Sequence, residues 1–281
     1  MKPEMQNNLA CSPMSNNHFI RSIAIGLLLL ACQLSDAVAQ DGTTGRYRLN
    51  AFTIGETNLL DTYLTPEEYK GLEMRLLFQS YRTSRHHKNR HYILTHQGHF
   101  AYPQNRAESN NMIAAFYHLQ YAWRWHKDMM LANNPLHLEG GVGIEATMGY
   151  IHNTRNSNNP VQAKVNANIV PTCMASYPFH VRNKEWRVNY EVAFPLAGLM
   201  FSPNYGQSYY EIFGIGDYDH NIVATSLHNR PSLRHALTID IPIRKVYLRM
   251  GYFGDYQQEK VNGLKFHNYS HQLFIGYLKN L

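Results

Sequence analysis

Residues 113–125, IAAFYHLQYAWRW, contain the clearest structural pattern of the chain. Every odd-numbered residue of this stretch is apolar or aromatic, whereas the even-numbered residues include His118, Gln120 and Arg124. Successive side chains of a β-strand point to opposite faces, so this period of two predicts a strand with one apolar face. The other face is partly polar and carries charge.

The same alternation recurs along the chain in segments of unusual length, such as 135–152, 161–178 and 184–201. Strands in soluble proteins usually have about 5 to 6 residues, whereas a tilted strand that crosses a bilayer needs about 9 to 11. The sequence therefore predicts an all-β fold, a transmembrane antiparallel up-and-down β-barrel of about twelve strands. The expected strands are 46–58, 71–83, 90–102, 111–127, 135–152, 161–178, 184–201, 207–216, 222–228, 233–243, 245–255 and 264–278. Ten strands is the alternative, because single-chain bacterial barrels have even strand numbers.

Aromatic residues gather near the ends of the expected strands. Amphipathic rings settle where the bilayer meets water, so these residues are predicted to lie at the membrane interface. They are Tyr121, Trp123, Trp125, Tyr150 and Trp186.

The face opposite the apolar one is predicted to line the barrel interior. Acids and bases on it are nearly balanced and often fall on neighbouring strands, which favours ion pairs that close the lumen over an open aqueous pore. The residues assigned to this polar network are Glu73, Arg75, His118, Arg124, Glu139, Glu145, Lys164, Arg187, Glu191, Asp240 and Arg249.

The first forty residues have the composition of a secretory signal peptide. Arg21 precedes an apolar run of residues 23–31, and Ala37-Val38-Ala39 provides small residues at the exit. We expect residues 1–39 to be a signal peptide cleaved near Ala39, and residues 40–281 to form the barrel. Lipidation of Cys32 within Leu29-Leu30-Ala31-Cys32 is the alternative.

Composition excludes several classes of protein. Only 16% of the 281 residues are charged and 12% are aromatic, the opposite of a disordered chain. The net charge is +6, and the basic residues are scattered rather than clustered, so no nucleic-acid partner is expected. Removal of residues 1–39 leaves Cys173 as the single cysteine of the 40–281 segment, which excludes an intramolecular disulfide there.

No catalytic, cofactor-binding or metal-binding set emerges from the sequence. His86, His87 and His91 lie among Arg85, Lys88 and Arg90, and this spacing favours a solvated basic turn over a metal site. A lipid hydrolase in a barrel wall would carry His-x-Ser along one strand, and none of the 16 histidines has a serine two residues later. His271 falls on the apolar face of the last strand without such a partner.

Three stretches carry a resemblance to a known family. They are residues 61–71 (DTYLTPEEYKG), 202–218 (SPNYGQSYYEIFGIGDY) and 230–242 (RPSLRHALTIDIP). Together they resemble an uncharacterised outer-membrane family of the Bacteroidetes, domain of unknown function 3316. The resemblance implies a β-barrel in the outer membrane and supplies no known activity and no known catalytic residues.

The sequence thus favours an integral outer-membrane β-barrel of a Gram-negative bacterium, with a structural or narrow-pore transport role. Its expected partners are outer-membrane lipid and the barrel-assembly machinery. An outer-membrane lipid-active enzyme and a secreted soluble β-protein that binds a ligand are the alternatives.

Overall fold

The computed structural model describes residues 45–157 and 159–281. The predicted signal peptide, with its cleavage site at Ala39 and the alternative lipidation at Cys32, lies outside the described residues. Among the described residues, no helix combines the length and apolar character needed to cross a membrane.

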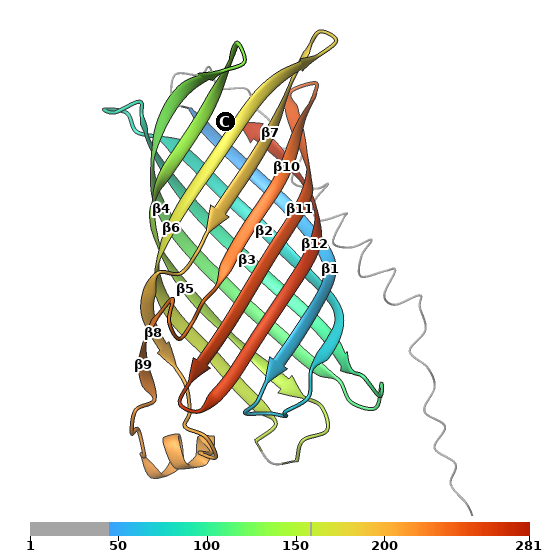
Figure 1. Cartoon of the computed structure of the whole chain (residues 1–281), viewed down its shortest axis with the longest axis vertical. Coiled ribbons are helices and arrows are strands. Elements are labelled where there is room, and N and C mark those ends of the chain that lie inside the picture. The colour runs from blue at the N-terminus through green and yellow to red at the C-terminus, as the bar shows by residue number, and fades with distance from the viewer. Residues whose placement is uncertain (1–44, 158) are drawn as a thin grey trace, which may run out of the picture. The chain divides into compact units, whose positions relative to one another are not determined.

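Ten antiparallel strands form a closed barrel, which confirms the predicted fold class (Figure 1). The barrel begins with β1 and is closed by its pairing with β12, where Tyr47 lies opposite Asn280. Around the wall the order is β1, β2, β3, β4, β5, β6, β7, β10, β11 and β12. The bounds are β1 Arg46–Asp61, β2 Tyr69–Thr83, β3 Arg90–Asn105, β4 Met112–Leu131, β5 Asn134–Asn153, β6 Val161–Val181, β7 Lys184–Ala193, β10 Leu233–Ile243, β11 Val246–Val261 and β12 Leu264–Asn280.

Two further strands, β8 (Ala197–Phe201) and β9 (Ile222–Ser226), extend the sheet outside the ring. The sequence predicted one strand over 184–201, but the structure divides it at Pro195 into β7 and β8. Both pieces pair with the same edge of β6, β7 with residues 172–181 and β8 with residues 165–169. Proline has no N–H to donate to the ladder, which explains why the strand is interrupted there. β9 pairs with β8, so twelve strands are present while ten close the barrel.

The strand predicted at 207–216 is wrong. This segment contains a short π-helix, η1 (Glu211–Ile215), between Gly206 and Gly216, whose φ angles are +80° and +84°. The Glu211 carboxylate accepts hydrogen bonds from the Ser208 amide at 2.6 Å and from its hydroxyl at 2.9 Å. These hydrogen bonds lower the pKa of Glu211 below its usual value. Local capping, together with glycine at two positive-φ positions, thus outweighs the alternating aromatic pattern.

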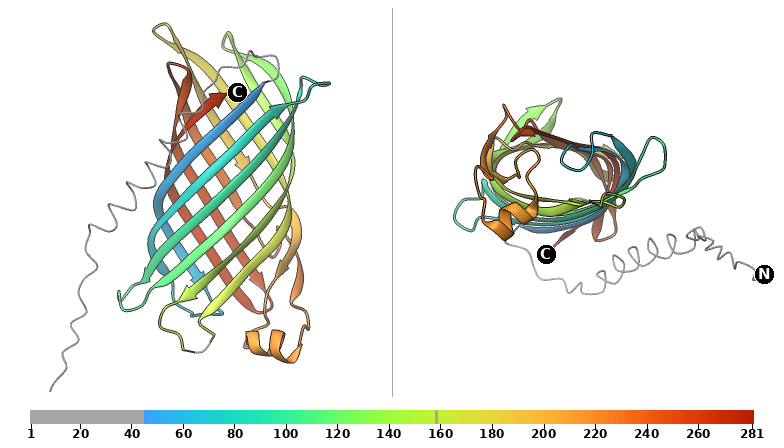
Figure 2. Two further views of the ribbon diagram at one scale, coloured as in Figure 1. Left: turned by 180° about the vertical axis from the view of Figure 1, so that it is seen from behind. Right: turned by 90° about the horizontal axis from the view of Figure 1, so that it is seen from below.

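The two ends of the barrel differ in the length of their connections (Figure 2). We call the end that carries Arg46 and Asn280 the terminus end, and three of its four connections, residues 132–133, 182–183 and 244–245, are two-residue turns, while residues 84–89 form a longer one. Positive φ angles at both Ala132 and Asn133, and at Arg182 and Arg244 in the other two turns, make these turns tight. The opposite end, here the loop end, has the longer connections 62–68, 106–111, 154–160 and 194–232, together with one two-residue turn at 262–263.

The wall is apolar on the outside and largely polar on the inside. On β4, Leu119 is 37% exposed on the outer surface, whereas its neighbour Gln120 lines a cavity inside the barrel. Other apolar side chains exposed on the outside are Leu76, Phe100, Ile144, Met148, Val165, Leu237, Leu273 and Ile275. Buried inside are polar side chains that include Thr53, Gln97, Thr147, Asn166, Thr238 and Gln272. This distribution is the reverse of that in a soluble globular protein.

Candidate functional site: the barrel interior

The eleven residues assigned to the lumen from the sequence lie on strands of the closed ring. Arg187 and Glu191 on β7 are half-buried. The other nine are buried: Glu73, Arg75, His118, Arg124, Glu139, Glu145, Lys164, Asp240 and Arg249.

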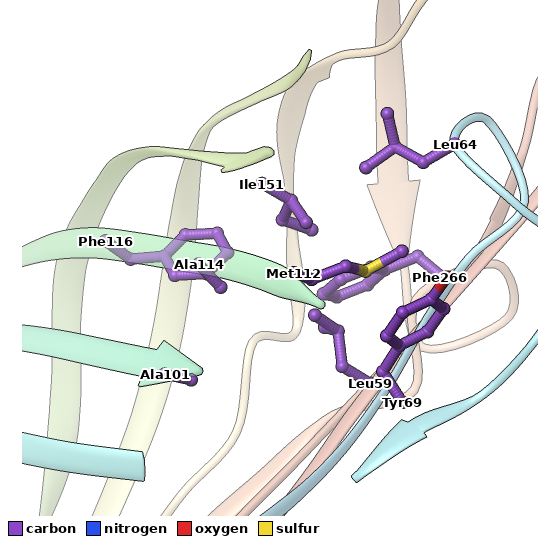
Figure 3. Packing of buried hydrophobic residues seen from close by; sticks show 9 residues of the cluster. All are labelled: Leu59, Leu64, Tyr69, Ala101, Met112, Ala114, Phe116, Ile151 and Phe266. Carbon is purple, nitrogen blue, oxygen red and sulfur yellow. The ribbon is translucent and has the colours of Figure 1, made fainter. Parts of the chain in front are cut away.

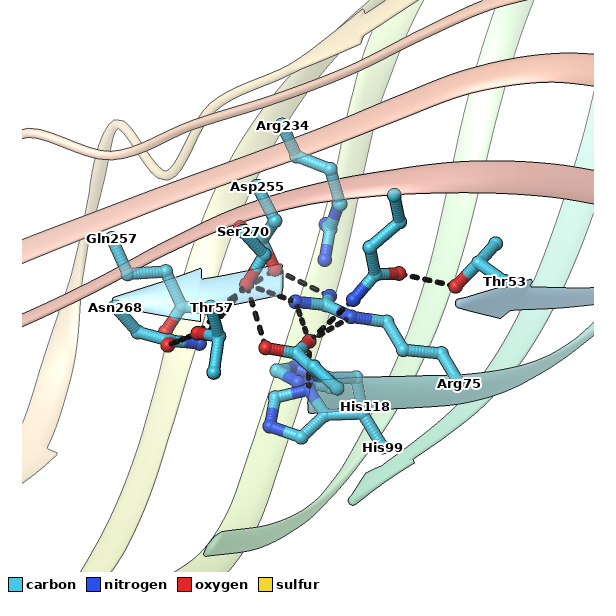
Figure 4. Close-up of polar contacts among 12 residues, drawn as sticks. Thr53, Thr57, Arg75, His99, His118, Arg234, Asp255, Gln257, Asn268 and Ser270 are labelled. Atoms are coloured by element: carbon cyan, nitrogen blue, oxygen red, sulfur yellow. Dashed lines mark hydrogen bonds and ion pairs between the residues drawn. The ribbon is translucent and has the colours of Figure 1, made fainter. Parts of the chain in front are cut away.

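Arg75 of β2 is the centre of one hydrogen-bonded cluster (Figure 4). Its guanidinium contacts Glu73 at 2.5 Å and Asp255 of β11 at 2.5 Å, and donates to the Ser270 hydroxyl at 3.2 Å. Ser270 and Gln272 of β12 in turn donate to the two oxygens of Glu73, at 2.7 Å and 2.8 Å. The arginine charge is thus shared between two buried carboxylates. The cluster joins β2, β12 and β11 from the inside.

A second cluster forms near the loop end around Lys164 of β6. Its ammonium group lies 3.1 Å from Asp61, 3.4 Å from Glu259 and 3.8 Å above the ring of Phe266. Arg230 donates to the other oxygen of Glu259 at 2.9 Å. Two cations and two carboxylates therefore neutralise each other in a buried group, which is the arrangement that makes buried charge tolerable.

Three more arginines pair with acids inside the barrel. Arg249 of β11 binds Asp240 of β10 through two hydrogen bonds, at 2.6 Å and 2.8 Å. Arg124 of β4 pairs with Glu191 of β7, and Nη1 of Arg124 lies 3.9 Å from Glu139. The remaining contact joins Arg234 to Glu145. Arg187 differs, since it pairs with Glu185 of its own strand at 3.1 Å where both side chains are partly exposed.

Sequence reasoning missed five charged members of these clusters. Arg234 could have been found, because it shares its parity with Asp240 on one strand. Asp255 was the last residue of its expected strand. In the structure β11 continues to Val261, and this extension also places Glu259 inside the barrel. The other two, Asp61 and Arg230, lie at or beyond strand ends, where alternation no longer assigns a face.

Apolar side chains pack together in the interior near the loop end (Figure 3). The connection between β1 and β2 contributes Leu64, which is 7% exposed, and its carbonyl accepts a 2.6 Å hydrogen bond from Asn156 of the β5–β6 connection. Two loops meet here, and the cluster adjoins the Lys164 group through Phe266. Its buried members are Leu59, Leu64, Tyr69, Ala101, Met112, Ala114, Phe116, Ile151 and Phe266.

Small cavities remain between the clusters. One of about 60 Å³ is bordered by His118, Glu145 and Arg234, and a neighbouring one of about 20 Å³ shares these three residues. A cavity of about 270 Å³ lies at the terminus end and meets the first at Arg249 and Asn189. Since one water molecule needs at least about 10 to 15 Å³, the inner two cavities admit only a few.

The five aromatic residues assigned to the membrane interface lie on outward-facing positions. Tyr121, Trp125 and Tyr150 are exposed, while Trp123 and Trp186 are half-buried. Tyr150 lies opposite Ala115, ten residues before Trp125 on β4. Ten residues rise about 34 Å along a strand, and a tilt of about 40° reduces this to a height of about 26 Å. This height matches the apolar band of about 25 Å found around outer-membrane barrels.

His271 lies on the outer face, as its position among apolar residues of the last strand predicts. Its Nδ1 is 2.6 Å from the hydroxyl of Tyr252 and 3.4 Å from that of Tyr256. Both tyrosines belong to the neighbouring strand β11. The histidine is thus held by phenol groups, which are poor partners for nucleophilic catalysis.

Solved structures similar to this chain include three bacterial membrane proteins. They are the translocator domain of the autotransporter NalP from Neisseria meningitidis (12% identity, TM-score 0.38, 93% of this chain and 97% of that chain), the transport unit of the autotransporter AIDA-I from Escherichia coli (9%, 0.38, 93% and 98%) and the COG4313 outer membrane channel from Pseudomonas putida F1 (8%, 0.37, 88% and 98%). Each TM-score is below 0.5, and the fold assignment rests on the strand pairing described above. No curated protein matches the chain.

The family is shown by the sequence itself. A family model described as "Protein of unknown function (DUF3316)" matches residues 25–281, which include all twelve strands and the π-helix. The match covers most of the chain, in agreement with the resemblance carried by residues 61–71, 202–218 and 230–242. The chain therefore belongs to the DUF3316 family.

Proposed function

We propose that this chain is an integral outer-membrane β-barrel of a Gram-negative bacterium whose lumen is closed to solutes. The distribution of polarity carries this proposal: apolar side chains face outwards and ion pairs fill the interior. In a bilayer every backbone polar group of a spanning strand needs a partner, which a closed ring provides. A soluble barrel that binds an apolar ligand would have its apolar face inside.

The proposal includes a route and an orientation. Residues 1–39 act as a signal peptide removed near Ala39, and the barrel-assembly machinery then inserts the remaining chain into outer-membrane lipid. Bacterial outer-membrane barrels have short periplasmic turns and longer extracellular loops. The two-residue turns therefore support a periplasmic terminus end, and the loops that carry Leu64 and Arg230 are assigned to the cell surface.

The closed interior favours a structural role over a pore. A conducting path would have to pass the Arg75 and Lys164 clusters and the apolar cluster around Leu64, and two cavities along it measure about 20 and 60 Å³. The buried ion pairs also link strands that are not neighbours in the wall, and so stiffen the barrel.

Narrow transport is the second candidate, because the cavities are contiguous from the terminus end to Arg230. The outermost has about 270 Å³ and shares residues with the next, which in turn shares Arg234 with the last. Opening of the Arg234–Glu145 and Arg230–Glu259 pairs would extend this path towards the loop end.

Two measurements on the purified protein in detergent test the proposal. First, a folded barrel should migrate differently on a gel before and after heating, whereas equal migration would contradict the membrane barrel. Second, the wild-type protein reconstituted in a planar bilayer should show no steady conductance above that of protein-free membranes. The double variant with Arg230→Ala and Arg234→Ala should conduct ions if the Arg230–Glu259 and Arg234–Glu145 pairs block a path. Stable steps from the wild type would overturn the closed lumen and leave the barrel itself intact.

A further inference from the structure

A group of metal-binding side chains lies inside the terminus end, although no metal site is apparent along the sequence. Three neighbouring strands contribute: His91 from β3, His126 and Asp128 from β4, and His137 and Glu139 from β5. The strand register places His126 opposite Glu139 and Asp128 opposite His137. In the set His91, His126 and Glu139, one ligand atom from each residue lies within 4.8 Å of the other two.

The three residues of this set have buried polar atoms without a hydrogen-bond partner. These atoms are Nε2 of His91, Nδ1 of His126 and Oε2 of Glu139. The Glu139 side chain is only 7% exposed, so its free oxygen is withdrawn from bulk water. An unsatisfied buried donor or acceptor is costly, so one such atom on each of three neighbouring side chains indicates that something else satisfies them.

The remaining polar atoms of the same side chains are already held. His91 Nδ1 lies 3.3 Å from the Thr83 hydroxyl, and His126 Nε2 lies 2.8 Å from the Asp128 carboxylate. The Tyr81 hydroxyl donates to Oε1 of Glu139. Metal-ligating histidines typically use their second nitrogen in this manner, because the outer contact fixes the tautomer and the orientation of the ring.

We propose that Nε2 of His91, Nδ1 of His126 and the Glu139 carboxylate bind a divalent transition-metal ion of the Zn²⁺ type. Two imidazoles and a carboxylate suit such an ion and leave a fourth position for water. Ligand bonds of about 2.0 to 2.2 Å place tetrahedral ligand atoms roughly 3.4 Å apart. The ligand atoms now lie within 4.8 Å of one another, and His126 Nδ1 is 4.0 Å from Glu139 Oε1. Small side-chain rotations would shorten these distances to about 3.4 Å.

A hydrated ion can reach the site, and the local charge permits its binding. His91, His126, His137 and Glu139 all line the cavity of about 270 Å³ at the terminus end. The nearest cation is Arg124, whose Nη1 is 3.9 Å from Glu139, but its charge is paired with Glu191. The ligand Glu139 and the nearby Asp128 supply two negative charges, which balance the charge of the divalent ion.

Calorimetric titration tests the site. The full barrel, purified without a histidine tag, folded in a zwitterionic detergent and freed of metal by a chelator, is titrated with Zn²⁺. We expect one ion bound per chain, and a rise in melting temperature on saturation, because binding stabilises only the folded state. Titration with Co²⁺ should give visible absorption bands of a tetrahedral or five-coordinate ion. The absence of binding at millimolar Zn²⁺ would overturn the proposal.

Variants locate the site, and gel migration before and after heating establishes that each is folded. His126→Ala and Glu139→Gln should each weaken Zn²⁺ binding by about tenfold or more, and Glu139→Gln keeps the shape of the side chain in case His126→Ala does not fold. Asp128→Asn removes the contact that orients His126 and should weaken binding by about 10- to 100-fold.

His180→Ala is the matched control. His180 is exposed on β6 near the same end of the barrel, opposite Glu185, and should leave Zn²⁺ affinity and the Co²⁺ spectrum unchanged. Wild-type affinity in both His126→Ala and Glu139→Gln would show that the ion binds elsewhere. If His180→Ala lost as much Zn²⁺ affinity as His126→Ala and Glu139→Gln, this too would show that the ion binds elsewhere.

Discussion

Arg75 and Asp255 are 180 residues apart in the chain, and their side chains meet at 2.5 Å inside the barrel. The two residues lie on β2 and β11, which are separated in the wall by β1 and β12. Their contact therefore spans the seam where the first and last strands close the ring. Similar contacts, such as Arg124 with Glu191, span two strands elsewhere in the wall.

Arg75→Ala should strongly destabilise the barrel. The substitution leaves the buried carboxylates of Glu73 and Asp255 without their cation, and breaking a buried pair in this way costs about 3–5 kcal/mol. Urea unfolding in detergent, followed by gel migration or circular dichroism, measures the loss.

Arg187→Ala is the matched control for Arg75→Ala. Arg187 pairs with Glu185 where the two side chains are 31% and 45% exposed. Exposed pairs contribute little, so we expect a loss of about 1 kcal/mol or less. Equal losses in the two variants would show that the Arg75 cluster is hydrated rather than buried.

Leu119 and Gln120 test the assignment of faces. Leu119→Arg puts a guanidinium on the outer wall, which costs about 2–4 kcal/mol near the bilayer midplane. Gln120→Arg faces the interior opposite Glu145 and should cost less. Unfolding of both variants in lipid bilayers gives the comparison, and a greater loss at position 120 would mean that the strand faces the other way.

Cysteine labelling separates a membrane barrel from a soluble one. In a Cys173→Ser background, needed because Cys173 is free and exposed, Leu119→Cys should resist a water-soluble maleimide in liposomes and react with a lipid-soluble one. Gln120→Cys should not react with the lipid-soluble reagent. Rapid aqueous labelling of Leu119→Cys would be incompatible with a lipid-facing wall.

Deletion of residues 269–281 should prevent membrane insertion. These residues make up most of β12, which pairs with β1 on one side and β11 on the other. Without them both neighbours have open edges, and the backbone groups on those edges have no partner in lipid. The amount of truncated protein in isolated outer membranes, compared with full-length protein, measures the effect. Equal amounts would refute the expectation.

Gly141→Ala should destabilise the barrel, whereas Gly140→Ala should not. A Cβ atom at position 141 would lie 1.8 Å from the Trp123 carbonyl oxygen and 2.7 Å from Cα of Arg124, so β4 and β5 would have to move apart. Such overpacking costs about 1–3 kcal/mol. At Gly140 a Cβ meets nothing within 4 Å. Matching unfolding curves for the two alanine variants would contradict this view of the β4–β5 contact.

The barrel could be predicted from the sequence because its signal is local. Alternation over 113–125 fixes both the secondary structure and the side of the wall on which Leu119 and Gln120 lie. The prediction was wrong at 207–216, where spacing of aromatic residues imitates a strand. There the Ser208–Glu211 hydrogen bonds and two positive-φ glycines produce a π-helix instead.

The partners inside the barrel could not be predicted in the same way. Alternation assigns Arg75 to a face, but the choice of Asp255 depends on barrel closure, strand register and the length of β11. His91 is similar: its sequence neighbours are basic, and its partners in the proposed metal site, His126 and Glu139, come from two other strands. Alternation was sufficient to predict the strands of the closed ring and the faces of their residues, because both depend on neighbouring residues in the chain. Which charges meet follows from the folded barrel, because closure of the ring brings distant strands within bonding distance.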